Sequence, residues 1–204
     1  MSLWDSSAII GDIKSKSRAP LAMYFHDYRD DLKKDLRGLL SSMLVQLCDQ
    51  SYDSHHKILS TFYSTHHNGA QSPSDEALLL CLVDLVKLPR PTPIYLIVDG
   101  LDESPNTSTQ LFHRKRVLSF LEDIVNAQLH NLRLCVTSRP EVDIKAILEP
   151  LAFRTVSLEN ESGQKKDIQD YIESFVLRNK NMRRWNTKYK QLVFDVLTKK
   201  ADGM

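Results

Sequence analysis

The sequence is short of glycine and cysteine and contains no long hydrophobic run. Its six glycines are scattered, and none belongs to a glycine-rich loop. Its three cysteines stand far apart among apolar neighbours, which indicates reduced, buried thiols rather than a disulfide framework. The longest strictly apolar run, residues 77–83, is much shorter than the ~20 residues that a membrane-spanning helix needs. Because its start also lacks a secretory signal, we expect a soluble cytoplasmic chain.

An excess of charge of either sign is absent as well, since 27 Lys and Arg face 26 Asp and Glu. This balance gives no electrostatic case for binding nucleic acid or an anionic membrane. The densest basic clusters, residues 113–116 and 182–185, are short and flanked by helical patterns, so we interpret both as solvated helix faces. We therefore expect neither nucleic acid nor a membrane as a partner.

Two further groups of residues give only weak evidence for a functional site. The histidine pairs at 55–56 and 66–67 would lie about 16 Å apart on a helix, so a single zinc ion could not use both pairs. Ser138, His26 and Asp99 have the residue types of a hydrolase triad, but the sequence lacks the G-x-S-x-G motif that would present the serine as a nucleophile.

What the chain does contain is an alternation of apolar strands and amphipathic helices. Near-continuous apolar runs at 94–98 and 132–136 are typical of central parallel strands, which are buried on both faces. Ser72 is expected to cap a helix that starts at Pro73. Strands are expected at 20–28, 94–99, 132–140 and 153–158, and helices at 5–17, 32–50, 54–65, 73–88, 111–128, 141–148, 164–179 and 187–199.

Strands that alternate with helices indicate parallel crossover units. The predicted fold is therefore α/β, a three-layer arrangement in which a parallel sheet has helices on both faces. The last two predicted helices follow the final predicted strand and would begin a separate helical region.

Two of the apolar strands run directly into polar residues. Asp99 ends the first, with Asp102 and Glu103 close behind it, and Thr137, Ser138 and Arg139 follow the second. In open α/β sheets, ligands bind beyond the carboxyl ends of the strands, so both polar tips should face one crevice.

Carboxylates crowded beside an apolar strand repel one another unless a cation compensates their charge. Magnesium suits them, because it takes a few carboxylate oxygens, keeps its waters and bridges to phosphates. Arg139 could reach a terminal phosphate. The alternative is that Asp99 caps a turn while Asp102 and Glu103 are solvated, since an apolar run that ends in Asp is common.

The stretch "IYLIVDGLDES" at 94–104, followed by "NLRLCVTSRPE" at 131–141, resembles the NACHT family of P-loop NTPases within the STAND signal-transduction ATPases. The likeness is closest to the large fungal, NLR-like NACHT proteins with ankyrin, WD or similar repeats. "PLAMYFHDYRD", "DLRGLLSSMLVQL" and "VLTKKADGM" also look like this group, so the resemblance covers nearly the whole chain.

The resemblance implies ATP and Mg²⁺ as cofactors and a role for each polar tip. Asp99 would be the Walker B acid, which holds Mg²⁺ through water, and Asp102 or Glu103 would orient the attacking water. Arg139 matches the family's sensor position, and Thr137 and Ser138 beside it would contact the nucleotide. Which of the two acids matters more, and whether the nucleotide is ATP or GTP, stays open.

The phosphate-binding motif G-x-x-x-x-G-K-[ST], which such a site needs, occurs nowhere in the sequence. The family places it just before the helix expected at 5–17, so we expect the first core strand and its loop to lie upstream of Met1. We also expect that strand's place, between the strands at 94–99 and 132–137, to be vacant. The chain would then be an internal piece of a longer protein, with a partial NACHT core at 1–160 and the start of a helical lid at 161–204.

Two functions remain open on this basis. The chain is either part of a nucleotide-binding switch that cannot bind or hydrolyse ATP alone, or a nucleotide-independent interaction module or inactive truncated product that binds no cofactor. Its partners would be a nucleotide, other domains of a longer NACHT protein, or further copies of the chain.

Overall fold

The computed structural model describes residues 10–15, 19–30, 33–50, 53–89, 91–105, 111–157, 162–182 and 184–201. These residues form two compact units, Met1–Phe153 and Arg154–Met204. The predicted division into a nucleotide-binding core and a lid, with its boundary at residue 160, stays a prediction.

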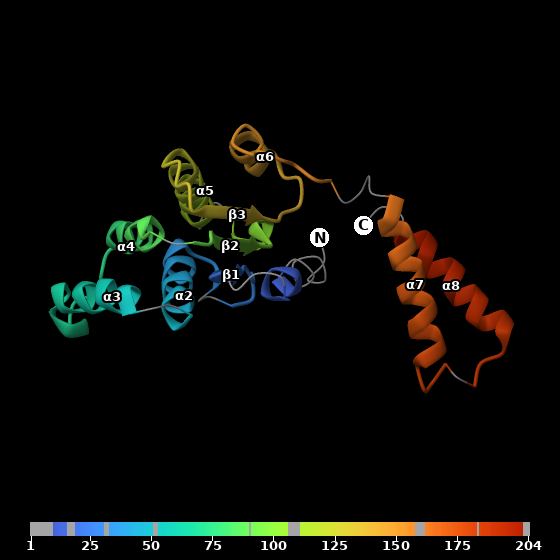
Figure 1. Ribbon diagram of the computed structural model, residues 1–204. Helices are drawn as coiled ribbons and strands as arrows, with labels where there is room; N and C mark the ends of the chain where they lie inside the picture. The colour runs from blue at the N-terminus through green and yellow to red at the C-terminus, as the bar shows by residue number, and fades with distance from the viewer. Residues whose placement is uncertain are drawn as a thin grey trace. The chain divides into compact units, whose positions relative to one another are not determined.

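The first unit contains a sheet of three parallel strands, β1 (Leu21–Phe25), β2 (Ile94–Asp99) and β3 (Leu132–Val136), in the order β1-β2-β3 (Figure 1). The register places Val98 of β2 between Tyr24 of β1 and Val136 of β3. The predicted α/β class with an all-parallel sheet is confirmed.

The prediction of a vacant strand position between residues 94–99 and 132–137 is wrong. β2 and β3 pair directly along their whole length, and the Thr137 amide continues the ladder by donating to the Val98 carbonyl at 2.9 Å. Strand order is set by contacts between distant segments, which the sequence of one strand does not specify. β1 and β3 are the two edge strands of the described sheet. The side chains of Gln46 and Gln50 form hydrogen bonds with the backbone of Leu21 and Met23 in β1, and no described strand pairs with the outer edge of β3.

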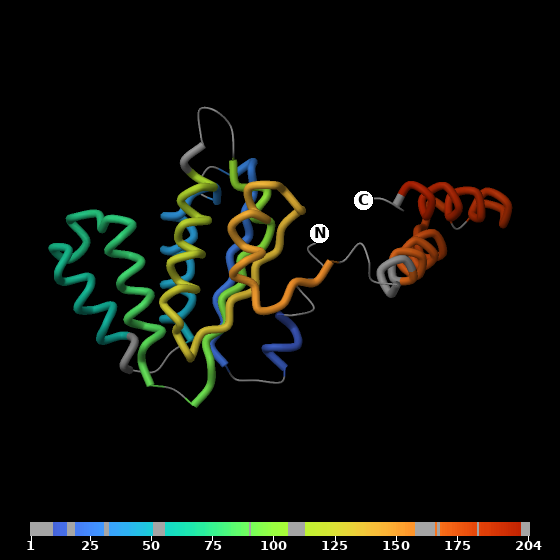
Figure 2. Tube along the Cα trace, turned by 90° about the horizontal axis from the view of Figure 1, so that it is seen from above, coloured from blue at the N-terminus to red at the C-terminus, as the bar shows by residue number. Residues whose placement is uncertain are grey.

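Alternating strand residues build the main hydrophobic core on one face of the sheet. Ala22, Tyr24, Leu96 and Val98 lie on this face together with buried side chains of the helices. Figure 2 shows α2 (Leu36–Asp49) and α5 (Leu111–Asn126) beside the strands on this side, with α3 (Asp53–Thr65) and α4 (Asp75–Lys87) farther out. The helical residues 10–15 lie on the other side of the strands.

Local capping fixes where two of these helices begin. The Asp35 carboxylate accepts a hydrogen bond from the Gly38 amide at 2.8 Å at the start of α2. α4 is capped by Ser74, whose hydroxyl accepts from the Ala77 amide at 3.1 Å, and not by Ser72 as predicted. The Ser72 hydroxyl instead accepts a hydrogen bond from Arg37 at 2.8 Å.

The strand predicted at 153–158 is absent from the described part of that segment. Residues 153–157 form no strand, and Leu158 lies outside the described residues. Phe153 is fully exposed and Val156 half-exposed, so neither side chain packs as it would in a sheet. A strand needs a hydrogen-bonded neighbour, and none is present for this segment among the described strands.

The remaining elements follow β3. α6 (Val142–Leu148) packs against α5 and contributes Ile144 to the core. The second unit is a pair of helices, α7 (Ser162–Arg178) and α8 (Thr187–Ala201), in contact with each other. No helix in the described ranges is long and apolar enough to cross a bilayer.

Candidate functional site

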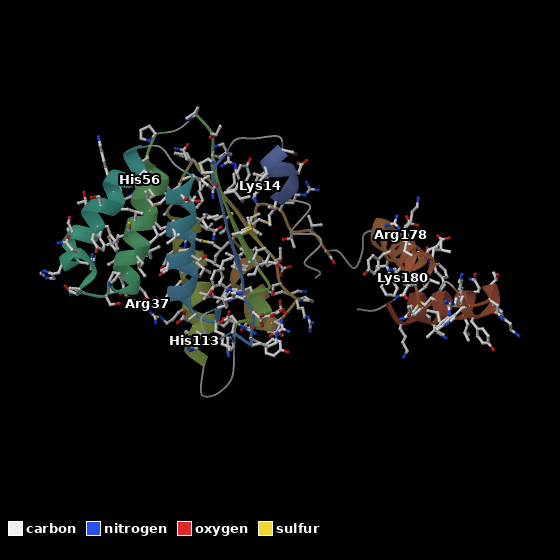
Figure 3. All side chains as sticks on the ribbon, turned by 90° about the horizontal axis from the view of Figure 1, so that it is seen from below. Lys14, Arg37, His56, His113, Arg178 and Lys180 are labelled. Atoms are coloured by element: carbon white, nitrogen blue, oxygen red, sulfur yellow. The ribbon has the colours of Figure 1, made fainter. Side chains whose placement is uncertain are left out.

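A cavity of about 340 Å³ lies at the carboxyl ends of the three strands. This is the end at which α2 and α5 begin, and Figure 3 shows Arg37 and His113 near those starts, with Lys14 and His56 at the opposite end. Every residue assigned to the site from the sequence lines the cavity. Its walls are Phe25, His26, Asp27, Arg29, Lys33, Asp99, Gly100, Asp102, Glu103, Thr137, Ser138 and Arg139.

Asp99 and Thr137 are joined across the ends of β2 and β3. The Thr137 hydroxyl donates a hydrogen bond to the Asp99 carboxylate and accepts one from the Gly100 amide at 3.1 Å. Gly100 has a left-handed backbone with φ of 67°, which disfavours residues with a side chain. The turn lets the backbone leave β2 sharply, and the Leu101 amide then donates to the Thr137 carbonyl at 3.0 Å.

Asp102 and Arg139 form the second contact between the two strand ends. The Arg139 amide donates to the Asp102 carboxylate at 3.0 Å, and the Arg139 Nε atom lies 3.5 Å from the other carboxylate oxygen. The Asp102 side chain is only 13% exposed, whereas that of Arg139 is 76% exposed. Asp102 is therefore held in place, while the Arg139 guanidinium extends into solvent at the mouth of the cavity.

Glu103 and Ser138 complete the predicted set. Glu103 closes the short 3-10 turn Leu101–Glu103, in which its amide donates to the Gly100 carbonyl at 2.8 Å. The Ser138 hydroxyl donates to the Arg139 carbonyl at 2.8 Å. All six predicted residues therefore lie together at the carboxyl end of the sheet.

His26 is a site residue that the sequence raised only as part of a hydrolase triad with Ser138 and Asp99, and all three residues line the cavity. His26 follows β1, is 4% exposed, and neither ring nitrogen makes a hydrogen bond of good geometry. Burial lowers the pKa of His26 from its ordinary 6.5 to about 4, and this outweighs the opposing interaction with the Lys33 backbone. The imidazole is neutral at neutral pH.

Arg114 is a site residue that the sequence did not reveal, and its interpretation as part of a solvated cluster at 113–116 is wrong. It is 4% exposed, because it lies on the face of α5 that also carries the buried Val117, Leu118 and Leu121. Those residues stand three, four and seven positions after it, a spacing that could have indicated burial. Arg116 does lie on the exposed side, where it pairs with Asp75 at 2.6 Å.

Buried polar groups gather at this end of the sheet. His26, Ser104, Arg114 and Thr137 are the buried polar or charged residues in the part of the chain that the structure describes, and all four lie around the strand ends. Buried polar groups destabilise a fold unless they are paired, so such a gathering is typical of a functional site.

The donor chemistry of the site suits a hard cation. Asp99, Asp102 and Glu103 offer carboxylate oxygens, and Mg²⁺ is commonly held by one or two carboxylates and its own waters. Over the described ranges no preassembled group of three metal-ligating side chains occurs, in this cavity or elsewhere. For the histidine pairs weighed above, His56 and His67 are exposed, His66 contacts the Phe62 carbonyl at 2.8 Å, and the His55 side chain lies outside the described residues.

Residues 5–139 match the sequence model of the family described as Nephrocystin 3, N-terminal. No curated protein and no solved structure matches the chain. The NACHT family itself is not detected; the matching domain is one that precedes NACHT domains in NLR-like proteins. The match spans more than half of the chain, includes all three strands and ends at Arg139, so this protein belongs to the Nephrocystin 3 N-terminal family.

Proposed function

We propose that the carboxyl end of this sheet is the magnesium-binding half of an ATP-dependent switch site of the NACHT type. The observation that carries the proposal is the bridge of Asp99 to Thr137 at the ends of two adjacent parallel strands, with Asp102 and Arg139 paired beside it. Ligand sites of open α/β sheets lie at such strand ends.

In this proposal each residue has a distinct task. Asp99 holds Mg²⁺ through water, and the Thr137 hydroxyl fixes the orientation of the Asp99 carboxylate. Arg139, whose guanidinium is exposed, contacts the terminal phosphate, with Ser138 beside it. Because Asp102 is engaged by Arg139, Glu103 is the better placed acid to orient a water molecule. Bound magnesium would neutralise phosphate charge.

The phosphate-gripping loop would come from a strand that adds to the open edge of β3. β1 and β2 carry mostly buried side chains, whereas four of the five residues of β3 are half-buried and Arg133 is exposed. An unpaired edge of this kind accepts a further strand.

A nucleotide-independent interaction module is the second candidate, and the C-terminal helices favour it. Only Ile172 and Val176 are buried among the described hydrophobic residues of the second unit. Its exposed large hydrophobic residues would suit other domains of a longer protein or further copies of the chain. They are Val156, Tyr171, Phe175, Leu177, Trp185, Tyr189, Leu192, Val196 and Leu197.

We place the chain in the cytoplasm. Cys48, Cys81 and Cys135 are all free thiols, which suits a reducing compartment. Burial raises the pKa of Cys48 and of Cys81 to about 11, so both stay protonated at neutral pH.

Titration with a fluorescent ATP analogue and Mg²⁺ tests the proposed function. The chain alone should show no saturable binding, because it has no phosphate loop. A version to which an apolar strand and a G-x-x-x-x-G-K-[ST] loop are fused before Met1 should bind, and Asp99→Asn in that version should abolish binding. Failure of the extended version to bind would favour the interaction module.

A further inference from the structure

Arg114 connects parts of the site that are distant in the sequence. Its Nε atom donates to the Ser104 carbonyl at 2.9 Å, and its Nη2 atom donates to the Asp102 carbonyl at 2.6 Å. Its Nη1 atom donates to the Glu141 carboxylate at 2.7 Å and lies 3.4 Å from the Asp143 carboxylate. One buried guanidinium thus joins the turn after β2 to the start of α6.

These contacts close a ring of four residues. Arg114 donates to the Asp102 carbonyl, and the Asp102 carboxylate accepts from the Arg139 amide at 3.0 Å. The Arg139 carbonyl accepts from the Glu141 amide at 2.8 Å, and the Glu141 carboxylate accepts from Arg114. Asp102 and Arg139, which both line the cavity, are therefore held relative to each other by hydrogen bonds that run through Arg114 and Glu141.

The side chain of Glu141 belongs to the ring and not to the cap of α6. Glu141 stands at the N-cap of α6 and makes no capping hydrogen bond, and its carboxylate accepts a hydrogen bond from Arg114. Lysine at position 114 could not make all four contacts, since a single ammonium group lacks the planar fork of a guanidinium.

We infer that Arg114 is a positioning residue, which sets the relation between Asp102 and Arg139 and couples both to the start of α6. A change at the cavity that moves Arg139 must also move Glu141, because their backbones are hydrogen bonded. The significance of this coupling for a bound nucleotide rests on the proposed function, whereas the coupling itself does not.

Amide hydrogen exchange followed by NMR, without any ligand, tests the inference. Arg114→Met should raise the exchange rate of the Arg139 amide roughly tenfold more than it raises that of the β2 amides, because the turn opens locally. Arg114→Lys should give an intermediate increase. The matched control is Arg116→Met, two positions along α5, which removes the ion pair to Asp75 and should leave the Arg139 amide unchanged.

A merely structural role would give a different result. If Arg114→Met raised all exchange rates by the same factor, or if Arg116→Met acted equally on Arg139, the inference would be overturned. If Arg114→Met does not fold, Glu141→Gln provides a milder test. The Glu141 side chain is 44% exposed, and Asp143 still faces the Arg114 guanidinium in that variant. Glu141→Gln should also accelerate exchange selectively at Arg139, and an unchanged rate would contradict the ring.

Discussion

His26 should make this protein lose stability in mild acid, and its buried position sets the size of the effect. The imidazole is neutral in the folded state because burial lowers the pKa of His26 to about 4. Arg114, close by, also lowers this pKa, while Asp102 and Asp35 act against the shift. In the unfolded chain the same group titrates near 6.5, its ordinary value.

The sign of the effect follows from proton counting. Between pH values of about 6.5 and 4 the unfolded chain binds a proton at His26 and the folded chain does not, so the free energy of unfolding falls as the pH falls. The His26 contribution changes little above that window. At about pH 4.5 the loss amounts to about 2.5 kcal/mol relative to about pH 7.

Urea unfolding at these two pH values measures the effect. His26→Gln, which cannot be protonated, should reduce the pH-dependent loss by about 2.5 kcal/mol. His56→Gln changes an exposed histidine on α3 and should keep the full loss. If the His26 variant and the unmodified chain lost the same free energy between the two pH values, the assignment of a buried neutral imidazole would be refuted.

Three further predictions concern stability in urea at neutral pH. Gly100→Ala should cost about 1–2 kcal/mol, because its φ of 67° disfavours a side chain, and an unchanged midpoint would contradict the turn geometry. Ser74→Ala should cost about 1 kcal/mol through loss of the α4 cap, whereas Ser72→Ala should cost clearly less; the reverse order would mean that Ser72 is the cap. Leu47→Ala should cost about 2–5 kcal/mol because Leu47 is fully buried. Val45→Ala, at a 67% exposed position on the same helix, should cost little, and equal effects would refute the orientation of α2.

The sequence was sufficient for what depends on local pattern. Apolar runs identified β2 and β3 as parallel strands, but the prediction that both are buried holds only for β2, because Arg133 of β3 is exposed and the other four residues of β3 are half-buried. Leucine spacing identified α2, because burial of one helix face produces a periodic pattern. The polar residues after those strands could be placed at one edge because parallel strands end together. Asp99 and Arg139 accordingly lie at the same cavity.

What depends on distant contacts could not be predicted. The apolar pattern at 153–158 favoured a strand, but a strand also requires a neighbour, which the pattern does not report. The order of β2 and β3 likewise depends on pairing between segments far apart in the chain. The burial of His26 and Arg114 was not predicted, because polar and charged residues are mostly exposed.

We propose that β3 presents an open edge to a strand that carries the phosphate loop, beside a magnesium-binding strand end. Backbone amides alternate along a strand, and the Thr137 amide points to β2, so those of Leu134 and Val136 point to the outer edge. Hydrogen exchange at these two amides should be fast in this chain and slowed by roughly a hundredfold or more in the version fused to a strand and phosphate loop before Met1. Equal protection of both amides in the two versions would contradict the claim.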